Sequence, residues 1–305
     1  MKHLYYVLTS RCNQICDICP RAGTKRQRDA DIEAGIERLA KVIDENSVTD
    51  ITVSGGEPSL FKGFRNVIDL LDEKNIRTVI LSNSMKFSDK KYAEDSFVCI
   101  RHPENFRLVS AVHSLDNERH DKVTGIKNSL SRTAEGLRNV LGIGITVEVK
   151  CIIGAHNFTE LPNYPQWVNR NVSPDANLIF CSIDYAGMTK EQIGRYRIDF
   201  KSIRPYLEQA FDNSEKWLKA GNTAGAEIPL CGIDPYYWNM LIPAPTTNSI
   251  YDDSHWEKET QSVSDIGPKA KKCDQCIVKG MCHGIWRTQY LEYGEDAVQP
   301  YKQSV

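Results

Sequence analysis

The first two-thirds of this 305-residue chain alternate short strand-like segments with amphipathic helical segments. The strand-like segments are rich in β-branched and other apolar residues, and they span residues 4–9, 50–53, 76–81, 107–112, 145–153 and 178–183. Between them, apolar residues recur at helical spacing in segments 32–43, 64–71 and 131–141. Strands that alternate with helices, without a tandem strand pair, predict a parallel sheet.

The number of strand–helix units sets the predicted architecture. Eight such units close a full TIM barrel, whereas about six are recognisable in this chain. The fold class is therefore α/β, and we predict a partial (β/α)6 TIM-like barrel, or an open parallel sheet, over residues 1–219. After a helix at 203–218 and a Gly- and Ala-rich stretch at 220–226, the sequence becomes irregular and rich in proline and aromatic residues. We expect residues 220–305 to form a small, irregular C-terminal domain.

Composition and charge exclude several classes of protein. The formal net charge is −2, so the chain lacks the basic excess of most nucleic-acid-binding proteins. No run approaches the roughly 20 apolar residues of a membrane span, and Met1-Lys2-His3 leads into a strand rather than a signal peptide. We therefore predict a cytoplasmic protein with no nucleic-acid and no membrane partner. Thiols stay reduced in that compartment, so the ten cysteines indicate metal binding rather than disulfides.

Three cysteines follow the first predicted strand in the spacing C-x3-C-x2-C, namely Cys12, Cys16 and Cys19. Three thiolates are one short of the four that saturate a cubane iron–sulfur cluster. One iron would keep an open position for a substrate or cofactor, whereas a fully ligated metal mostly holds a fold together. A loop at the carboxyl end of a first strand is also where α/β folds place their active sites.

This cysteine motif resembles the cluster motif of the radical S-adenosylmethionine (SAM) superfamily. The resemblance implies that Cys12, Cys16 and Cys19 hold a [4Fe–4S] cluster whose open iron binds the amino and carboxylate groups of SAM. It also implies that an electron, supplied by a donor such as flavodoxin or ferredoxin, cleaves SAM reductively. The resulting 5′-deoxyadenosyl radical would abstract a hydrogen atom from a substrate, while the protein binds and orients the cofactors.

Further segments agree with the resemblance in their order and in their position at strand ends. Gly55-Gly56-Glu57-Pro58 follows the second strand and is similar to the family's GGEP motif, which meets the SAM amino group. Its glycines permit close backbone approach, and its proline stiffens the turn. Asn83 after the third strand and Ser114 after the fourth lie where the family often contacts SAM. Ile18 departs from the family, which usually carries an aromatic residue at this position, near the adenine.

A second cysteine group lies near the C-terminus, where Cys273, Cys276 and Cys282 have the spacing C-x2-C-x5-C. It resembles the SPASM/twitch extension of the same superfamily, which holds an auxiliary iron–sulfur cluster. The resemblance implies an auxiliary [4Fe–4S] cluster with Cys231 as its fourth ligand. It implies a single, twitch-like cluster, because no cysteine follows Cys282. The alternative is a structural zinc site formed by Cys231, Cys273, Cys276 and either Cys282 or His283.

Three cysteines stay outside both groups, namely Cys99, Cys151 and Cys181. Buried free cysteine usually behaves as a small apolar residue, so we expect these three to serve packing. Cys151 and Cys181 lie on the fifth and sixth predicted strands, where they could face the interior of a partial barrel. A thiol in that position would be able to donate a hydrogen atom to a substrate radical, as an epimerase requires.

The leading functional hypothesis is a radical SAM enzyme that modifies a peptide by cross-linking or epimerisation. Twitch- and SPASM-type relatives often modify ribosomally made peptides, while others act on small molecules, which is the alternative. No separate leader-peptide-binding domain precedes the first strand, so we expect recognition by a carrier protein or by the barrel itself. Two hypotheses of a different class are a non-catalytic zinc or iron–sulfur protein and an iron–sulfur redox sensor. The GGEP-like turn has no evident use in a sensor.

Overall fold

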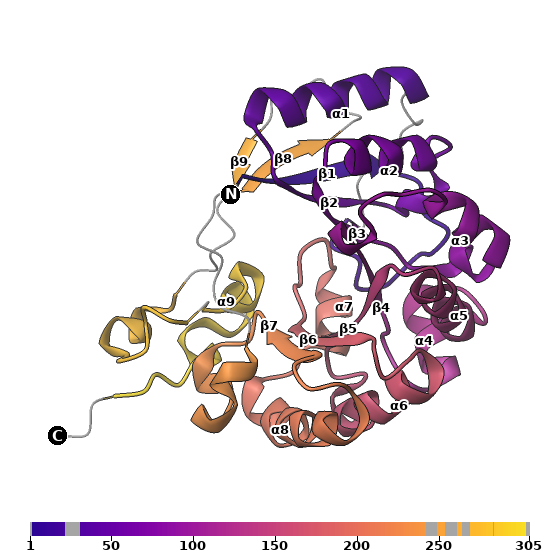
Figure 1. Cartoon of the computed structure of the whole chain (residues 1–305). Coiled ribbons are helices and arrows are strands. Elements are labelled where there is room, and N and C mark those ends of the chain that lie inside the picture. Colours follow the sequence, from indigo (N-terminus) through magenta and orange to yellow (C-terminus); the bar gives the residue numbers. More distant parts are fainter. Residues whose placement is uncertain are drawn as a thin grey trace.

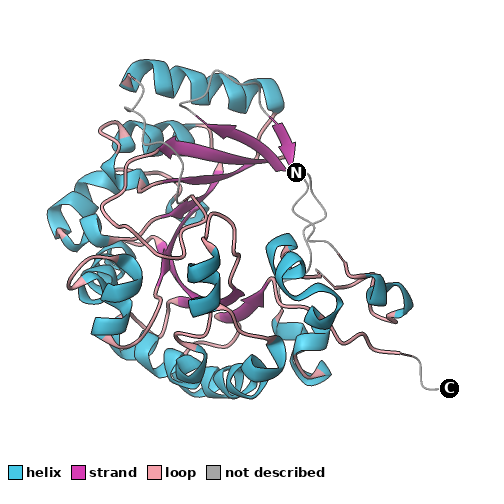
Figure 2. Cartoon of the chain, turned by 180° about the vertical axis from the view of Figure 1, so that it is seen from behind, coloured by secondary structure: helices cyan, strands magenta, loops and turns pink. Residues whose placement is uncertain are grey.

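The computed structural model describes residues 2–21, 31–241, 249–253, 261–263, 269–282 and 284–302. Within them the chain forms one nine-stranded sheet with the order β7-β6-β5-β4-β3-β2-β1-β8-β9. Strands β1 to β8 run parallel to their neighbours, and β9 pairs antiparallel with β8. The sheet curves into an arc that stays open on one side (Figure 1, Figure 2). The fold is thus a partial barrel whose two edge strands are β7 and β9.

The strands are β1 (His3–Thr9), β2 (Asp50–Gly55), β3 (Arg77–Leu81), β4 (Phe106–Ala111), β5 (Thr146–Ile153), β6 (Asn177–Ser182), β7 (Thr223–Ala226), β8 (Ser249–Asp253) and β9 (Gln261–Val263). The α-helices are α1 (Ile32–Asn46), α2 (Phe64–Glu73), α3 (Lys90–Phe97), α4 (Asn117–Thr124), α5 (Ser129–Gly142), α6 (Tyr164–Asn171), α7 (Lys190–Tyr196), α8 (Phe200–Trp217) and α9 (Arg287–Tyr293). Most of these helices cover the convex side of the arc (Figure 1). None of the described helices is both long and apolar enough to cross a membrane.

Side chains alternate between the two faces of the sheet, because successive residues of a strand point to opposite sides. On β5 the residues of one face belong to the main apolar core, and they are Val147, Val149, Cys151 and Ile153. On β6, Leu178 and Phe180 belong to the same core, whereas Ile179 and Cys181 do not. The main core therefore lies between the sheet and the helices on its convex side (Figure 1).

The concave face of the sheet is polar over much of its area. His3 Nε2 on β1 lies 2.9 Å from Thr52 Oγ1 on β2. The Tyr5 hydroxyl donates a 2.7 Å hydrogen bond to Ser54 Oγ. Further round the arc, Arg107 on β4 forms an ion pair with Glu148 on β5 at 3.5 Å. A full TIM barrel fills its interior mainly with branched apolar side chains, so this partial barrel differs from it in the chemistry of its lumen.

The structure confirms the six strands that the sequence predicts, with ends that differ by one or two residues. The predicted helices at 32–43, 64–71, 131–141 and 203–218 correspond to α1, α2, α5 and α8. Their apolar stripes do pack into the core. Strands and helices with a strong hydrophobic periodicity can be recognised from a short stretch of sequence, because one face of each must be buried.

The prediction that the chain is irregular after residue 220 was wrong in part. Strand β7 extends the sheet next to β6, and β8 and β9 extend it beyond β1. The sequence of β7, Thr-Ala-Gly-Ala, lacks the β-branched pattern of the other strands. A Cβ atom on Gly225 would lie only 2.6 Å from Leu241 Cδ2, so close packing requires small residues there. The division of the chain into domains at residue 219 stays a prediction.

Helix α5 packs directly against the segment that follows β3. A Cβ atom on Gly136 would lie 2.1 Å from the carbonyl oxygen of Ser84. One turn earlier, the Thr133 hydroxyl donates a 2.9 Å hydrogen bond to the carbonyl of Asn83. Gly136 weakens the helix by its own propensity, but its missing side chain lets α5 approach Ser84. The helix thereby positions the carboxyl end of β3.

We predict that Gly136→Ala lowers the free energy of unfolding by about 2–3 kcal/mol, because the added methyl group forces backbone apart in a packed region. Gly142→Ala is the matched control, since Gly142 also lies on α5 but has no atom within 4 Å of its would-be Cβ. It should leave stability unchanged or raise it by up to about 1 kcal/mol. Urea denaturation of both variants measures the difference. Equal effects would contradict the close contact.

Candidate active site

The loop that follows β1 carries Cys12, Cys16 and Cys19 and is fastened to the end of α4. The backbone N–H of Ile15 donates to the carbonyl of Thr124, and that of Asp17 donates to the carbonyl of Val123, both at 2.9 Å. Helix α4 ends at Gly125, whose φ of +71° gives the left-handed conformation typical of a helix end. The two backbone bonds fix the cysteine loop over the carboxyl ends of the strands, as the sequence predicts.

The three thiols of this loop influence one another. Burial raises the pKa of Cys16, and the neighbouring Cys19 and Cys12 raise it further. The backbone N–H of Gln14 donates to Cys12 Sγ at 3.4 Å, and the Cys16 thiol donates to Gln14 Oε1 at 3.3 Å. Cysteine thiolates hold iron–sulfur clusters, and hydrogen bonds to their sulfurs tune the reduction potential of the cluster. The donor set therefore fits the [4Fe–4S] cluster that the sequence predicts.

The turn Gly55-Gly56 packs against the backbone where the chain leaves β1. A Cβ atom on Gly55 would lie 2.2 Å from the carbonyl oxygen of Thr9, and one on Gly56 would lie 2.2 Å from that of Arg11. The N–H of Gly56 donates to Thr9 and the N–H of Glu57 donates to Arg11, both at 2.7 Å. The close approach that the glycines predict is present, and it joins two segments of the chain's own backbone.

The carboxylate of Glu57 is completely buried and satisfied by protein donors. Its Oε1 accepts from the backbone N–H of Ser59 at 3.0 Å and from the hydroxyls of Ser59 and Ser82 at 2.6 and 2.7 Å. Its Oε2 accepts from the backbone N–H of Asn83 at 2.6 Å. Burial raises the pKa of Glu57, and these hydrogen bonds oppose the shift. Pro58 begins the short 3-10 helix that Glu57 caps.

The structure brings Asn83 close to the cysteine loop, and it pairs Ser114 with a carboxylate. The Asn83 amide donates a 2.7 Å hydrogen bond to Asn13 Oδ1, and its nitrogen lies 4.0 Å from Cys12 Sγ. Ser114 is buried, and its hydroxyl donates to the carboxylate of Glu160 at 3.0 Å. Arg119 forms an ion pair with the same carboxylate. Among the described residues, the Ser114 hydroxyl thus hydrogen-bonds to Glu160 and to the backbone N–H of Asp116.

Ile18, in place of the family's usual aromatic residue, is buried in a small apolar cluster. The cluster also contains Val123, Ile183, Tyr185 and Tyr196. Next to it, Asp17 accepts a 3.0 Å hydrogen bond from the Tyr196 hydroxyl and pairs with Arg195 at 3.3 Å. Helix α7 therefore holds the cysteine loop from a second side. No local pattern of the sequence predicts this contact, because the residues lie far apart along the chain.

The second cysteine group is assembled from two distant segments. Cys231 and Cys273 pack against the same small apolar cluster of Ala270, Ile285 and Val298. The pKa of Cys231 is raised to about 11, first by burial and then by Cys282, Cys273 and Cys276. Cys282 Sγ accepts the backbone N–H of Leu230 at 3.3 Å. These sulfurs also fit a cluster, although no three His, Cys, Asp or Glu side chains of the described chain converge on a single metal ion. His283, the alternative ligand, lies outside the described residues.

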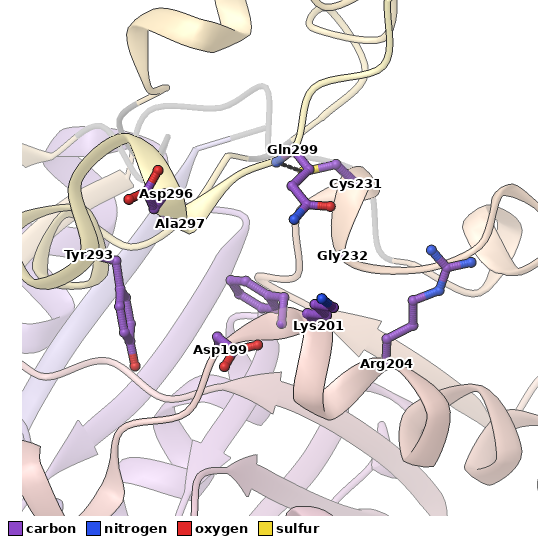
Figure 3. A pocket seen from close by; sticks show the side chains of 10 residues that line it. Asp199, Lys201, Arg204, Cys231, Gly232, Tyr293, Asp296, Ala297 and Gln299 are labelled. Atoms are coloured by element: carbon purple, nitrogen blue, oxygen red, sulfur yellow. Dashed lines mark hydrogen bonds between the residues drawn. The ribbon is translucent and has the colours of Figure 1, made fainter.

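A pocket of about 310 Å³ adjoins Cys231, and Figure 3 shows the side chains around it. Its walls come from the start of α8, from Cys231 and Gly232, and from the segment after α9. The backbone N–H of Gln299 donates to Cys231 Sγ at 3.4 Å across the upper side of this view (Figure 3). Farther along, Gln289 on α9 donates to the carbonyl of Ile183 at 2.9 Å. The C-terminal cysteines are thereby attached to the end of β6.

Three histidines follow strands β4 and β5, of which His113 and His120 are buried and His156 is half-buried. His113 follows β4, His120 lies on α4, and His156 follows β5. The rings of His113 and His120 are 5.7 Å apart, and His156 packs edge-on against Tyr196 at 5.1 Å. Burial lowers the pKa of all three, to about 4 for His120 and His156. They are therefore neutral at pH 7.

The N-terminal half of the chain matches the sequence model of a known protein family. A sequence model of the Radical SAM superfamily matches residues 6–160, which is 155 of the 305 residues. The chain belongs to the radical SAM superfamily. It is therefore an enzyme that depends on a [4Fe–4S] cluster and on SAM. The matched segment contains the cysteine loop, the Gly55-Gly56 turn, Asn83 and Ser114.

Curated relatives of this radical SAM protein have different activities. A probable GTP 3′,8-cyclase of Sulfurisphaera tokodaii is 22% identical over 222 residues, which cover 70% of this chain and 66% of that protein. The sporulation killing factor maturation protein SkfB of Bacillus subtilis is 24% identical over 155 residues, which cover 50% and 36%. The GTP 3′,8-cyclase of Helicobacter pylori is 29% identical over 152 residues, covering 48% and 45%. The chain thus spans between 36% and 66% of the length of these relatives.

Solved radical SAM structures share the fold along nearly the whole chain. Streptococcus suis SuiB bound to S-adenosylmethionine has a TM-score of 0.68 at 15% identity, covering 99% of this chain and 76% of SuiB. SuiB bound to precursor peptide SuiA gives 0.66 at 14% identity, with 98% and 74% covered. The anSMEcpe structure with AdoMet and the Cp18Cys peptide gives 0.64 at 14% identity, with 98% and 92% covered. These likenesses confirm the α/β partial barrel.

We predict that Glu57→Gln lowers the free energy of unfolding by about 2–4 kcal/mol. Each carboxylate oxygen accepts one backbone N–H, from Ser59 and from Asn83. A Gln side chain has one oxygen, so one buried N–H would face its NH2 group in either orientation. Glu104→Gln, at a side chain with 70% exposure, is the control and should change stability by less than about 0.5 kcal/mol. Chemical denaturation measures both, and a neutral Glu57→Gln would refute the hydrogen-bond assignment.

We predict that acid destabilises the protein through His113, His120 and His156. Their folded pKa values lie below the ordinary 6.5, so the unfolded chain binds protons first, and stability is lost as the pH falls below 6.5. Between pH 7 and pH 5, His120 and His156 together should account for about 2–4 kcal/mol. Denaturation at both pH values tests this. In His156→Phe, which keeps the packing on Tyr196 and leaves His113 and His120 in place, the pH dependence should fall by about a third, whereas an unchanged slope would contradict the assignment.

Proposed function

We propose that this radical SAM enzyme abstracts a hydrogen atom from a peptide and modifies it by cross-linking or epimerisation. The observation that carries the proposal is the gathering of Cys12, Cys16 and Cys19 at the carboxyl end of β1. We assign these three thiolates as ligands of the [4Fe–4S] cluster. When bound, the cluster supplies the electron that cleaves SAM to a 5′-deoxyadenosyl radical.

The chain's own residues hold and orient these groups. The Gln14 N–H that donates to Cys12 Sγ would stabilise the thiolate, and Asn83 lies close enough to the loop to contact SAM. We also assign Gly55, Gly56, Glu57 and Pro58 to SAM binding. Since protein donors occupy the Glu57 carboxylate, this turn would contact SAM through its backbone. Ser114 can take part only by sharing its hydroxyl with Glu160.

We further propose that Cys231, Cys273, Cys276 and Cys282 hold an auxiliary [4Fe–4S] cluster in a SPASM/twitch-like domain of residues 220–305. Support comes from the packing of Cys231 and Cys273 against one small apolar cluster and from the backbone N–H groups that donate to Cys231 and Cys282. A zinc site with the same cysteines is the alternative. An electron donor such as flavodoxin or ferredoxin would reduce the enzyme.

A peptide substrate is supported by three of the similar proteins. SuiB was solved with precursor peptide SuiA, anSMEcpe was solved with the Cp18Cys peptide, and SkfB is a maturation protein. The GTP 3′,8-cyclases support the alternative of a small-molecule substrate. Epimerisation would require a hydrogen donor, and only one of the two candidate thiols is suitably placed. Cys151 faces the helices, whereas Cys181 lies on the opposite face of the sheet.

We predict that the anaerobically reconstituted protein forms 5′-deoxyadenosine from SAM and dithionite. The variant Cys12→Ala, Cys16→Ala, Cys19→Ala should form none and should retain about half of the iron, as two clusters require. Quantifying deoxyadenosine, iron and zinc per chain tests both sites. Cys99→Ala, at an exposed thiol outside both groups, is the control and should retain full iron and activity.

Other results would change the assignment in defined ways. If the triple variant contains zinc and no iron, the second cysteine group is assigned as a structural zinc site instead of an auxiliary cluster. Iron without deoxyadenosine in the wild-type protein would indicate a redox sensor and overturn the catalytic proposal. Loss of activity in Cys99→Ala would show that the effect of the triple variant is not specific to the loop.

A further inference from the structure

The inner face of β5 carries two ionic side chains into the lumen of the barrel. Its sequence, Thr-Val-Glu-Val-Lys-Cys-Ile-Ile, alternates strictly in polarity over the first five residues. Val147 and Val149 face the core beneath the helices, so Glu148 and Lys150 face the concave side. Parallel strands with helices on one face normally show near-continuous apolar runs when both faces are buried. The alternation therefore indicates that polar side chains line the concave side of the sheet.

Lys150 differs from Arg107, a cation on the same face, in how it is paired. Arg107 has Glu148 as an ion-pair partner at 3.5 Å. The Lys150 ammonium lies beside Cys181, and within the described ranges no carboxylate comes within ion-pair distance of it. Glu227 and Glu148 act on it only from farther away. Lys150 is thus a partly buried cation whose nearest neighbour is a thiol.

The thiol does not balance the positive charge. Cys181 raises the pKa of Lys150 most, burial lowers it, and Glu227 and Glu148 raise it further, so the amine is protonated at pH 7. Burial raises the pKa of Cys181 itself to about 12, so its thiol is neutral at the same pH. Lys150 is half-buried, so its ammonium is partly desolvated while no carboxylate lies within ion-pair distance among the described residues. Such a cation can still form a charge-assisted hydrogen bond with an incoming anion.

The strand register places this cation toward the mouth of the lumen. Lys150 lies level with Ala111 on β4 and with Ile179 on β6. Cys181, one step nearer the carboxyl ends of the strands, lies level with Ile152 and with Ala226 on β7. The ammonium reaches up toward Cys181 and thus points to the end of the sheet where the cysteine loop lies. A substrate that enters from this end would meet it.

We propose that Lys150 is a substrate-binding residue that receives a carboxylate of the peptide inside the barrel. This proposal rests on the proposed function, since it names the chemical class of group recognised by the same site. Lys150 would bind an acidic side chain or the C-terminal carboxylate as a charge-assisted ion pair. Arg107 cannot serve in the same way, because Glu148 already occupies it.

The first test compares stability, using Lys150→Met in the reconstituted holoenzyme. Met keeps the length of the side chain and removes the charge, so the thermal midpoint should stay unchanged or rise by a few degrees. Arg107→Met is the matched control on the same face. It leaves Glu148 without its partner and should lower the midpoint. A midpoint lowered as much in Lys150→Met as in Arg107→Met would assign Lys150 to the fold and overturn the proposal.

The second test measures binding without requiring turnover. Immobilised wild-type and Lys150→Met holoenzymes, each with SAM, are exposed to two random pools of short peptides, one with free and one with amidated C-termini, and retained peptides are identified by mass spectrometry. Retention from the free pool alone would assign the C-terminal carboxylate, and retention from both would assign an acidic side chain. Peptides that contain Asp or Glu should be enriched on the wild-type enzyme by about tenfold over Lys150→Met, as expected for one enclosed ion pair. Retention of GTP is measured in parallel.

The possible results separate this proposal from the proposed function. Equal enrichment on both proteins would overturn the role of Lys150 while leaving a peptide substrate in place. If the wild-type enzyme retains GTP, and no peptides, in a manner that depends on Lys150, this result would support an anion-binding role for Lys150 and would overturn the peptide substrate. If the wild-type enzyme retains neither peptides nor GTP more strongly than Lys150→Met does, the proposal is overturned, whatever the deoxyadenosine assay gives.

Discussion

The backbone contact between the ends of β1 and β2 is the constraint on which the site depends. Gly55 and Gly56 lie so close to the carbonyls of Thr9 and Arg11 that any side chain would collide with them. Two 2.7 Å hydrogen bonds form across this contact. They fix the point at which the chain leaves β1, and therefore where the three thiols lie. The same turn directs the next residue, Glu57, into the interior.

Glu57 links the contact between β1 and β2 to the carboxyl end of β3. A buried carboxylate is unfavourable unless hydrogen bonds replace its hydration. Here the donors come from Ser59 in its own turn and from Ser82 and Asn83 after β3. The motif glutamate thus stabilises the scaffold around the site. Asn83, held through its backbone by Glu57 and Thr133, can then present its side-chain amide to the cysteine loop.

The two faces of the sheet differ in polarity. The convex face and its helices bury the apolar core, while the concave face carries ions and hydroxyl groups. Because all strands from β1 to β7 are parallel, their carboxyl ends meet at one rim. Both cysteine groups lie there, the second one attached to β6 through Gln289. Segments more than 200 residues apart in sequence therefore share one opening.

The sequence by itself determined the six main strands, four of the helices and the two cysteine groups, because hydrophobic period and cysteine spacing are local properties. It also indicated the close approach at Gly55 and Gly56. The polar alternation at Glu148 and Lys150 is also readable in the sequence of the fifth strand. Only the tertiary structure decided which strand face each residue occupies, that β7 and β8 join the sheet, and that Glu57 and Ser114 turn toward protein partners. These outcomes depend on contacts between distant segments, and a local pattern carries no information about the partner that satisfies a buried polar group.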